Sequence, residues 1–585
     1  MPSPRRKTKI VCTMGPRLFE QGLVKPLMLA GMDVARFNFS HGTHESHLAW
    51  YREVCRLREE LGLPVATMLD TKGPEIRTGD FEGGRVTLEP GQLFTLTTEA
   101  CMGDQEHCCV TYADMPKDVQ PGSIVLIDDG LVGMEVQHVT DTEITCKVLN
   151  GGAVSNHKGI NIPGAHLSMP FVSEKDRSDL IFAAENGFDF IAASFTRSGE
   201  DIMAIRRVLQ EAGNTSIKII AKIENKEGVE NLEDIMRVSD GIMVARGDMG
   251  VEIPLEEVPG LQKHIIHECV LSGRPVITAT QMLDSMMKNP RPTRAEATDV
   301  ANAIYDGTSA IMLSGETAAG MYPVEAVETM VRIALKTEAD IDYKSEFAQA
   351  NYDTRCDITA AISHATVTSA HDLKAAAIIT VTKSGGTARM ISRYRPACPI
   401  IACAIDAQVW RQMNLSWGVV PLMISEERDT EALFEHAVAA GVHEHLLRDG
   451  ELAVITAGVP LGISGTTNMM KVQVVGHMLL RGNGVCGGEA TAPVYVASDE
   501  NLAETIELFR TGSILVCSQT TKHLLPLVRK ASGLILEDPD PDGQGVIAGM
   551  SLDIPVIIGA AHATEILSSG AVVTMNAKDG TVSCN

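Results

Sequence analysis

Residues 218–224, KIIAKIE, and residues 241–248, GIMVARGD, decide the fold of this 585-residue chain. Each is a short run rich in Ile, Val and Ala that ends in charged residues. Such runs are typical of strands that are buried on both faces of a parallel sheet. Amphipathic helical stretches separate these two runs from others of the same kind. In chain order, the eight predicted strands are residues 9–15, 33–40, 64–73, 188–195, 218–224, 241–248, 274–280 and 309–316.

Eight alternating strand and helix units predict a (β/α)₈ TIM barrel of the α/β class. The polar residues of the strands gather at the carboxyl ends, which is the face where barrel enzymes build their active sites. Because several strand ends carry cations and carboxylates together, we expect a catalytic site there. The polar residues are Arg36, Asn38, Ser40, Asp70, Thr71, Lys222, Glu224, Arg246, Asp248, Thr280 and Glu316.

The regular spacing breaks once, between Asp70 and Ser194. This segment contains short alternating runs separated by Gly, Pro and Asp, which predict a small β-barrel domain inserted after the third strand. A long insertion at the active-site face is typical of a lid. We therefore assign residues 1–70 and 169–338 to the catalytic barrel and residues 71–168 to the lid.

The composition restricts the partners and the compartment. The net charge of −25 argues against a nucleic-acid partner, because phosphate backbones select basic surfaces. No apolar run approaches the ~20 residues that span a bilayer, and the basic start lacks the apolar core of a signal peptide. The 13 cysteines have no regular spacing. These features favour the reducing cytoplasm and no membrane association.

The charged strand ends suggest a chemistry. Arg36, Arg77 and Lys222 supply positive charge, while Glu224 and Asp248 are oxygen ligands that suit Mg²⁺. Mg²⁺ beside Arg and Lys is typical of phosphoryl transfer. A P-loop kinase is excluded because the Walker motif is absent. The residues by themselves predict a metal-dependent enzyme that acts on a phosphorylated anion, and they leave open a Schiff-base reaction at Lys222.

Several longer blocks resemble the pyruvate kinase family, in register across about residues 7–475. The resemblance implies a phosphotransferase that moves phosphate from phosphoenolpyruvate to ADP, giving pyruvate and ATP in the last step of glycolysis. One turn departs from the family pattern, since Arg17-Leu18 stands where Ala-Ser is usual. The matching blocks include KTKIVCTMGP (7–16), GMDVARFNFSHG (31–42), MLDTKGPEIRTG (68–79), HKGINIPG (157–164), IIAKIENKEGVEN (219–231), VARGDMGVEIP (244–254), PVITATQMLDSM (275–286) and residues 291–327.

The resemblance implies roles at the matching positions. Lys222 resembles the lysine that stabilises the transferring phosphoryl group, and Arg36 and Arg77 resemble arginines that grip phosphates. The proton that enolpyruvate takes up has three candidate sources: Lys222, Thr280 or a relayed water. The other implied sets are Glu224 and Asp248 for Mg²⁺ or Mn²⁺; Asn38, Ser40, Asp70 and Thr71 for K⁺; Arg36, Lys222, Ser194, Arg246, Gly247, Asp248 and Thr280 for substrate; and Arg36, His41 and Lys158 for ADP or ATP.

A second α/β domain is predicted at residues 339–475. Its segment TKSGGTARMISRYRP places a Thr/Ser/Gly turn before a helix, where backbone N–H groups and hydroxyls can meet a phosphate. The spacing alone favours an ordinary capped turn, but the equivalent turn of pyruvate kinases holds a phosphorylated effector. The resemblance therefore implies allosteric regulation and, separately, a homotetramer. The implied effector residues are Thr382, Lys383, Ser384, Gly385 and Thr387.

Residues 485–585 exceed the usual length of the family. The Gly-rich stretch at 481–493 predicts a linker into an extra domain with strands at 513–517, 533–538 and 554–560. This domain resembles the swivelling phosphohistidine domain of phosphoenolpyruvate-utilising enzymes. Gln544 aligns with the phosphate-carrying histidine, and glutamine cannot carry phosphate in that way. The competing interpretations are a phosphohistidine-relay enzyme and a non-catalytic paralogue. A coupled assay for pyruvate separates both of them from an active pyruvate kinase.

Overall fold

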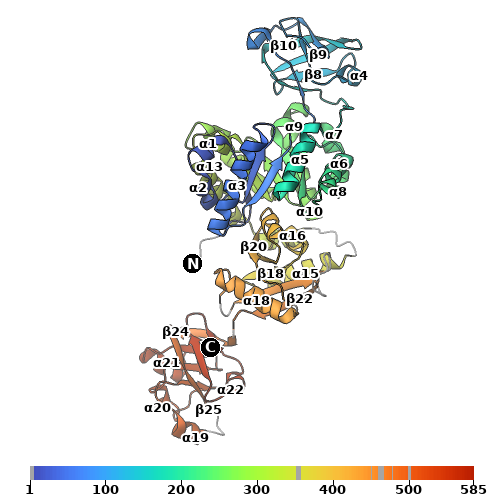
Figure 1. Ribbon diagram of the computed structural model, residues 1–585. Coiled ribbons are helices and arrows are strands. Elements are labelled where there is room, and N and C mark those ends of the chain that lie inside the picture. Colours follow the sequence, from blue (N-terminus) through green and yellow to red (C-terminus); the bar gives the residue numbers. More distant parts are fainter. Residues whose placement is uncertain are drawn as a thin grey trace. The chain divides into compact units, whose positions relative to one another are not determined.

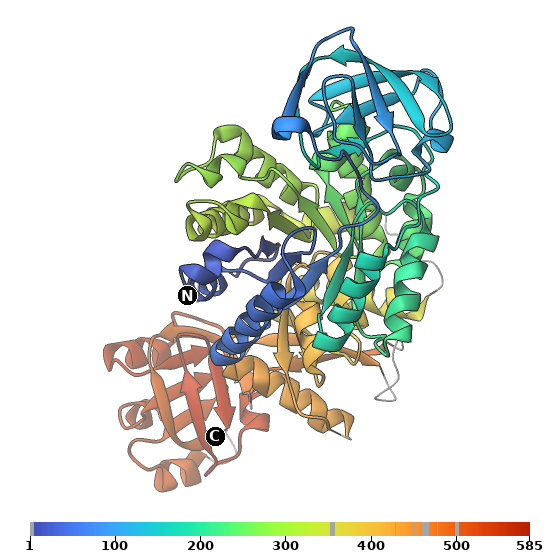
Figure 2. The same cartoon turned by 45° about the horizontal axis from the view of Figure 1, so that its top comes forward.

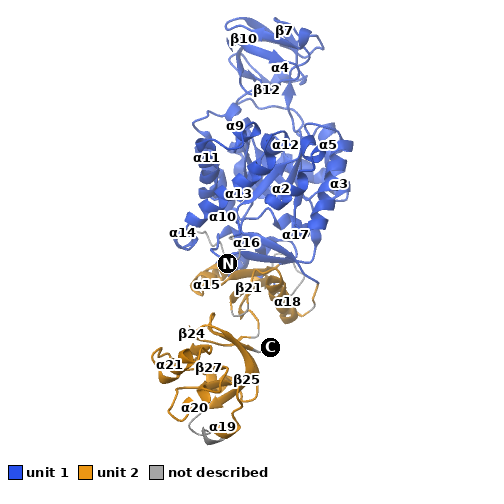
Figure 3. Cartoon of the chain, turned by 90° about the vertical axis from the view of Figure 1, so that its left-hand side faces the viewer, with its two compact units in different colours: residues 1–364, 382–425, 458–467 blue, residues 365–381, 426–457, 468–585 orange. Residues whose placement is uncertain are grey.

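The computed structural model describes residues 5–350, 357–427, 429–448, 451–458, 467–476, 478–497 and 502–584. The chain forms two compact units, coloured separately in Figure 3. Unit 1 holds residues 1–364, 382–425 and 458–467, and unit 2 holds residues 365–381, 426–457 and 468–585.

The predicted barrel strands are confirmed, and they close in the parallel order β1-β17-β16-β15-β14-β13-β3-β2. Each strand is short and buried along nearly its whole length, because helices cover its outer face and neighbouring strands its edges. The register places Arg36 beside Met68 and Lys222 beside Met243. The strands are β1 (Lys9–Thr13), β2 (Val34–Asn38), β3 (Ala66–Asp70), β13 (Phe190–Ala193), β14 (Lys218–Ile223), β15 (Gly241–Ala245), β16 (Val276–Ala279) and β17 (Ala310–Leu313).

Helices surround the barrel, as Figures 1 and 2 show in blue to yellow-green. Their apolar faces and the outward side chains of the strands form one large core. Local sequence sets the helix starts: Thr43 and Ser46 form a capping box at the first long helix, and Thr293 and Glu296 form another. The helices are α1 (Pro16–Glu20), α2 (Val24–Ala30), α3 (His44–Leu61), α5 (Glu174–Asn186), α6 (Gly199–Glu211), α7 (Lys226–Glu230), α8 (Leu232–Val238), α9 (Arg246–Glu252), α10 (Val258–Ser272), α11 (Arg294–Tyr305), α12 (Gly315–Ala318), α13 (Pro323–Asp340) and α14 (Tyr343–Gln349).

The insertion after β3 has its own sheet and its own hydrophobic core. Seven strands pair in the order β4-β12-β8-β9-β10-β6-β7. The two edges meet at an antiparallel bridge between Thr78 and Val110, which gives the small barrel expected from the sequence. Its elements are β4 (Ile76–Arg77), β5 (Arg85–Leu88), β6 (Leu93–Thr97), β7 (His107–Cys109), α4 (Met115–Asp118), β8 (Ile124–Ile127), β9 (Val132–Val139), β10 (Glu143–Asn150), β11 (Gly152–Ser155) and β12 (Gly159–Asn161).

The predicted α/β segment supplies strands and helices to both units. In unit 1, β19 (Ile400–Ala404) and β20 (Val419–Met423) pair in parallel, with α16 (Gly386–Arg393) and α17 (Ala407–Met413) beside them in the chain. In unit 2, β18 (Ala377–Val381) and β21 (Leu452–Gly458) pair in parallel. The remaining elements of this segment are α15 (Ile358–Asp372), α18 (Thr430–His443) and β22 (Thr467–Val474).

The extra domain is a mixed sheet in the order β23-β30-β29-β25-β26-β27-β28-β24. The three strands expected from the sequence are present as β26, β27 and β28. The prediction of a linker at 481–493 is wrong, because this stretch forms β24 and the start of β25, and β24 pairs with β28. Since β23 pairs with β30, the sheet begins at Met478, before the predicted boundary at 485. The strands are β23 (Met478–Arg481), β24 (Asn483–Cys486), β25 (Glu489–Ala497), β26 (Ile514–Cys517), β27 (Gly533–Leu536), β28 (Val556–Ile558), β29 (Val572–Asn576) and β30 (Thr581–Cys584).

Four short helices accompany this sheet: α19 (Leu502–Leu508), α20 (Leu525–Val528), α21 (Gln544–Ser551) and α22 (Ala563–Ile566). Gln544 is the first residue of α21, which fits the alignment that replaces a carrier histidine. His562, beyond β28, is largely exposed and lies 3.1 Å from Glu565. Across the described parts of the chain, no helix combines the length and the apolar character needed to cross a membrane.

Candidate active site

Lys222 lies at the centre of the polar cluster at the carboxyl ends of the barrel strands. It is the fifth residue of β14, and only 8% of its surface is exposed. Its Nζ lies 2.8 Å from Glu224 Oε1, 2.8 Å from Ser194 Oγ and 3.2 Å from Asp70 Oδ1. A buried ammonium group therefore sits between two carboxylates that come from different strands.

Asp70, the last residue of β3, joins Lys222 to Arg36. Arg36 Nε lies 2.5 Å from Asp70 Oδ2, and Arg36 Nη1 donates to Thr13 Oγ1 at 2.9 Å. Ser194 Oγ donates to Asp70 Oδ1 at 3.0 Å. Two cations and two carboxylates thus form one closed network, which holds each charged group in a fixed orientation.

The network sets the ionisation of its members. Burial alone would lower the pKa of Lys222, but the charges of Asp70 and Glu224 outweigh burial and raise it, so this side chain remains an ammonium group. Burial alone would raise the pKa of Asp70, yet Arg36 and Lys222 hold it below its ordinary value. Burial raises the pKa of Glu224 to about 7, against the opposing effect of Lys222.

Glu224 has an oxygen that could hold a cation. Its Oε2 accepts a hydrogen bond of 2.5 Å from Phe195 N. Its Oε1 is buried and lies 2.8 Å from Lys222 Nζ, with which it forms an ion pair. Asp248 is close enough for its charge to raise the pKa of Glu224. The described residues contain no cluster of three or more His, Cys, Asp and Glu side chains that could hold a metal, so protein carboxylates alone would supply an incomplete shell.

The loops after β15 and β16 meet beside these carboxylates. Gly247 N donates to Thr280 Oγ1 at 3.2 Å, and a Cβ at Gly247 would lie 3.3 Å from Thr280 Cγ2. Thr280 has φ of +69°, a conformation that is strained for a β-branched residue. The Arg246 side chain points to Asp299 and donates to Thr280 O at 2.7 Å, so it fixes the loop that carries Thr280.

The four residues assigned to K⁺ lie at the adjoining ends of β2 and β3. Asn38 and Asp70 are register partners on these strands. Asn38 Oδ1 accepts from Ser40 N at 3.1 Å, and Thr71 Oγ1 accepts from Ser194 N at 3.2 Å. The structure therefore brings all four residues to one edge of the barrel mouth, next to the Lys222 network.

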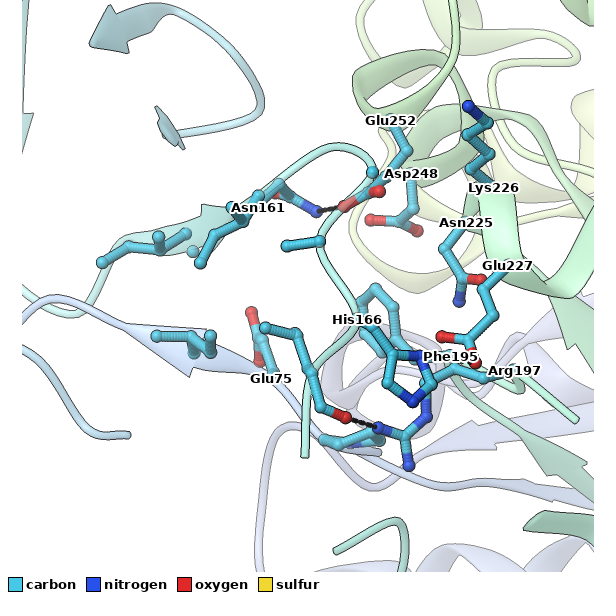
Figure 4. A pocket seen from close by; sticks show the side chains of 18 of the residues that line it. Glu75, Asn161, His166, Phe195, Arg197, Asn225, Lys226, Glu227, Asp248 and Glu252 are labelled. Carbon is cyan, nitrogen blue, oxygen red and sulfur yellow. Dashed lines mark hydrogen bonds and ion pairs between the residues drawn. The ribbon is translucent and has the colours of Figure 1, made fainter. Parts of the chain in front are cut away.

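A cleft of about 1110 Å³, partly open to solvent, lies between the inserted domain and the barrel mouth (Figure 4). Asn161 of β12 donates to Glu252 of α9 at 3.1 Å across it. Among the predicted site residues, all of which lie in the described ranges, only Asp248 lines the cleft.

The two positively charged site residues of the inserted domain, Arg77 and Lys158, form ion pairs with carboxylates of the same domain. Arg77 of β4 lies 2.8 Å from Glu75, and Lys158 lies 2.8 Å from Asp128. The structure therefore does not bring Arg77 into contact with the Lys222 network. His41 is exposed beyond β2, and its carbonyl accepts from His47 Nε2 at 2.7 Å.

Sequence reasoning overlooked several residues that line the cleft. Asp129 has a positive φ, and burial together with the charges of Asp248 and Asp128 raises its pKa. Arg197 and Asn225 follow directly after the β13 and β14 runs, so their place after a strand was a usable signal. The sequence contains no such signal for Asn161 and Glu252, because their hydrogen bond depends on how the inserted domain packs against the barrel.

The Thr/Ser/Gly turn opens α16 as expected. Gly385 has φ of +74° and precedes the helix, and Thr387 Oγ1 lies 2.7 Å from Thr467 Oγ1. Thr382 N donates to Cys403 O, and Lys383 is exposed. The turn thus presents Ser384 and Lys383 at the surface end of a parallel strand, which is a geometry that can receive a phosphate.

A TIM barrel whose mouth carries a buried lysine, an arginine and two carboxylates that suit Mg²⁺ is typical of an enzyme of phosphoryl transfer. The family model described as "Pyruvate kinase, barrel domain" matches residues 5–327, "Pyruvate kinase, alpha/beta domain" matches 360–473, and "PEP-utilising enzyme, mobile domain" matches 509–580. The chain belongs to the pyruvate kinase family. It transfers phosphate from phosphoenolpyruvate to ADP in the last step of glycolysis.

Individual relatives agree over nearly the whole length. The chain is 46% identical over 579 residues to the pyruvate kinase of Sporosarcina psychrophila, covering 99% of this chain and 98% of that one. It is 46% identical over 583 residues to that of Geobacillus stearothermophilus, with the same coverage. A crystal structure of a pyruvate kinase from Cryptosporidium parvum superposes with a TM-score of 0.76 at 42% identity, covering 80% of this chain and 96% of that chain. The resemblance, the activity and the appended domain expected from the sequence are confirmed.

Proposed function

We propose that the phosphoryl group is transferred at the network of Lys222, Arg36, Asp70 and Glu224. The observation that carries this proposal is the buried Lys222 ammonium, which lies within 3.2 Å of Asp70, Ser194 and Glu224 at the mouth of the barrel. A fixed, dehydrated cation stabilises charge on a transferring phosphoryl group without the cost of reorganising solvent. Arg36 adds a second cation, already oriented by Asp70 and Thr13.

Glu224 and Asp248 are the residues that would hold Mg²⁺ or Mn²⁺. The buried Glu224 Oε1, which now lies 2.8 Å from Lys222 Nζ, is a carboxylate oxygen of the kind that a hard cation prefers, and Asp248 is its acidic neighbour. When bound, the ion would neutralise phosphate charge and align the two substrates. Two protein carboxylates leave the other coordination positions to substrate and water oxygens.

The K⁺ shell would consist of Asn38, Ser40, Asp70 and Thr71. Asp70 would then serve two groups, because its carboxylate also binds Arg36 and Lys222. Because Asp70 would contact the ion as well as Arg36 and Lys222, bound K⁺ would help to fix the positions of these two side chains. Pyruvate kinases as a family use K⁺ together with a divalent metal.

The carboxylate of phosphoenolpyruvate would bind at the N-terminus of α9 and at Thr280. The positive φ of Thr280 and the close packing of Gly247 hold these two residues together, and Gly247 N now donates to Thr280 Oγ1 at 3.2 Å, a contact that the substrate carboxylate would replace. Arg246 would hold the Thr280 loop in place through its bond to Thr280 O. Ser194 would position Lys222 through their mutual hydrogen bond.

The cleft between the inserted domain and the barrel would receive ADP or ATP. Lys158 and Arg77 lie on the inserted domain and His41 follows β2 on the barrel; none of the three lines the cleft as it stands, so they would have to move toward a bound nucleotide. Arg77 and Lys158 now pair with Glu75 and Asp128, which are partly exposed, and these ion pairs would have to exchange for nucleotide phosphates. Closure of the inserted domain would then exclude water from the phosphoryl group.

We also propose that residues 382–387 bind a phosphorylated effector, and that the enzyme works as a cytoplasmic homotetramer. The open turn before α16 supports the first proposal, and the family resemblance supports the second.

The substitution Lys222→Met tests the proposed centre. We expect turnover to fall at least about 10²–10³-fold while the fold is retained, because one charge-stabilising group is lost. Lys336→Met is the matched control, since Lys336 is an exposed lysine on α13 that lies 2.8 Å from Asp340 and away from the cleft. A coupled assay for pyruvate at saturating substrates gives the rates, and near-normal turnover of Lys222→Met would sink the assignment.

A further inference from the structure

The inserted domain returns to the barrel through residues 165–171, AHLSMPF. Small or apolar residues alternate in this segment with polar residues or proline, a pattern that is typical of extended chain. Leu167 and Met169 pack against the core of the inserted domain, whereas Phe171 belongs to the core of the barrel. The chain therefore passes from one domain to the other between Met169 and Phe171.

Arg197 of the barrel binds two carbonyl groups of this return segment. Its Nη1 donates to Leu167 O at 2.9 Å, and its Nη2 donates to Met169 O at 3.1 Å. Every second carbonyl of an extended chain points to the same side, so the planar fork of a guanidinium group can span residues two apart. The guanidinium carbon also lies 5.9 Å from the centroid of the Phe171 ring. A lysine could not make this set of contacts, because its ammonium group lacks the fork.

Arg197 is itself fixed to the barrel. Asp201 Oδ2 accepts from Arg197 Nε at 3.3 Å and from Arg197 N at 3.0 Å, and Asp201 Oδ1 accepts from Arg197 Nη2 at 3.4 Å. Asn231 Nδ2 donates to Arg197 O at 2.9 Å. Arg197 lines the cleft (Figure 4), but all three of its guanidinium nitrogens donate to protein oxygens and only 16% of its side chain is exposed. These contacts favour a role in holding the chain over a role in binding substrate.

The inserted domain holds the same segment from its own side. Asp118, the last residue of α4, accepts from Ser168 N at 2.9 Å and from Ser168 Oγ at 3.0 Å. Three consecutive residues are therefore bound to the inserted domain through the middle one and to Arg197 through the outer two. The outgoing crossing has a separate anchor, since Gly73 N donates to Asp176 Oδ1 at 3.2 Å. Loss of Arg197 would thus loosen one crossing and leave the other in place.

We propose that Arg197 is a positioning residue, which holds the return segment so that the inserted domain keeps the orientation in which ADP binds. Without the fork, the inserted domain would take up a wider range of orientations. A nucleotide would then meet the groups of both domains at the same time less often, and its binding would weaken. This consequence rests on the proposed binding of ADP in the cleft, whereas the restraint on residues 167–169 does not.

Cleavage of the full-length protein by thermolysin, without substrates, tests the restraint. This protease cuts before large apolar residues, several of which lie in residues 165–171. Arg197→Gln should raise the rate of cleavage within this segment at least about fivefold, because opening the segment no longer breaks the two hydrogen bonds from the fork. Arg332→Gln, which alters an exposed arginine on α13, should leave the rate unchanged. Equal rates in Arg197→Gln and the unaltered protein would overturn the proposal.

The dependence of turnover on ADP separates positioning from direct contact with substrate. We expect Arg197→Gln to raise the KM for ADP about fivefold or more and to change kcat less than about twofold, because saturating ADP selects the orientation that binds it. Arg197→Lys should keep most of this defect, since an ammonium group retains the charge but not the fork. Recovery of the KM by Arg197→Lys, or a raised KM with unchanged thermolysin cleavage, would show that the charge acts on the nucleotide and would overturn the proposal.

The contact on the other side of the segment gives a further test. Asp118→Asn weakens the hold of the inserted domain on Ser168, so it should also raise the KM for ADP. Because the two contacts act in series on the same three residues, combining Asp118→Asn with Arg197→Gln should raise the KM little beyond the larger single effect. Fully additive effects would contradict a shared restraint. Faster cleavage of Arg197→Gln with an unaltered KM would leave the restraint in place and contradict the proposed site for ADP.

Discussion

The charge of Lys222 is maintained by protein carboxylates. Its neighbours Asp70 and Glu224 offset the effect of burial, so the ammonium persists in a site where an isolated lysine would lose its proton. Because the side chains share these contacts, we expect the replacement of any one of them to alter the electrostatics of the others. Removing one partner would leave a buried charge without compensation, which costs more than the pair itself contributes.

Residue contacts of this kind were only partly predictable. Asp70, Lys222 and Glu224 were assigned from their places at strand ends, and the barrel brings them together. Their pairing depends on contacts 152 residues apart in the chain, which strand patterns do not report. Arg77 was assigned to phosphate binding by resemblance, but its ion pair with Glu75 follows from the path of the chain into the inserted domain.

Glu75 gives a prediction at this scale. The resemblance to pyruvate kinases implies K⁺ dependence here, since K⁺-dependent members keep glutamate at the position that matches Glu75 and members independent of K⁺ tend to carry lysine. The enzyme should therefore require K⁺, and Glu75→Lys should lower the ratio of turnover with K⁺ to turnover without it toward one, because an ammonium group can replace the ion. Rates are measured in potassium and in tetramethylammonium buffers free of sodium.

Glu75 also pairs with Arg77, so a control must separate charge loss from K⁺ replacement. Glu75→Gln removes the same ion pair without adding an ammonium group, and it should keep the K⁺ requirement. Full activity of the unaltered enzyme without K⁺ would contradict the prediction outright.

At the scale of elements, the barrel strands were predictable because each is a continuous apolar run that ends in polar residues. The observed strands lie within the predicted ranges on all eight occasions. Strand β24 was missed because Asn483–Cys486 has no apolar pattern of its own. Its structure comes from pairing with β28, 70 or more residues further along the chain, and its one glycine allows close backbone approach: a Cβ at Gly484 would clash with Ala577 O.

Helix α3 carries a pH-dependent contact near its start. His47 is buried, stacks on Phe39 with ring centroids 4.1 Å apart, and lies 2.7 Å from His41 O through Nε2. Burial lowers the pKa of His47 below its ordinary value of 6.5. As pH falls through 6.5, the unfolded chain takes up a proton that the folded chain resists, so this residue lowers stability in acid.

The variant His47→Gln should therefore be less stable than the unaltered enzyme at pH 7.5, because the stacked ring is lost, and this deficit should shrink as pH falls to 5.5. The free energy involved is limited to about 1.4 kcal/mol per pH unit for one proton. Thermal unfolding midpoints across this range provide the measurement, with the exposed His443→Gln as control. A deficit that stays constant with pH would show that His47 titrates normally in the folded chain.

The turn before α16 supports a prediction about regulation. Thr387 lies with its hydroxyl 2.7 Å from that of Thr467, and Ser384 lies one turn earlier on the same loop. Ser384→Ala/Thr387→Ala should abolish activation by hexose monophosphates or AMP, because both hydroxyl donors to the phosphate are lost. The measurement is the phosphoenolpyruvate saturation curve with and without effector. Ser551→Ala, an exposed helical serine outside the turn, serves as control, and an unchanged activation curve in the double variant would place the effector elsewhere.

At the scale of the whole molecule, the appended domain is built as a separate module. Among the residues that the structure describes, two hydrophobic clusters of this domain draw their members from Leu479 to Val582. Every candidate catalytic residue lies before residue 320, and the position of the carrier histidine holds Gln544. Residues 509–580 match the mobile domain of phosphoenolpyruvate-utilising enzymes, and without the carrier histidine we expect a structural or regulatory contribution from this domain.

A chain that ends at Gly476 should accordingly keep phosphoryl transfer from phosphoenolpyruvate to ADP. The cut falls before β23, so the sheet of the appended domain is removed whole, including β24, which a cut at the predicted boundary of 485 would have divided. We expect pyruvate formation at saturating substrates to remain, while heat resistance, assembly state or the effector response changes, since a packed module is lost. The coupled assay, thermal inactivation and sedimentation measure these separately. A soluble, correctly assembled truncation without activity would contradict the prediction. So would acid-labile, base-stable ³²P from labelled phosphoenolpyruvate held on residues 478–585 of the full chain, because a histidine there would then be carrying phosphate.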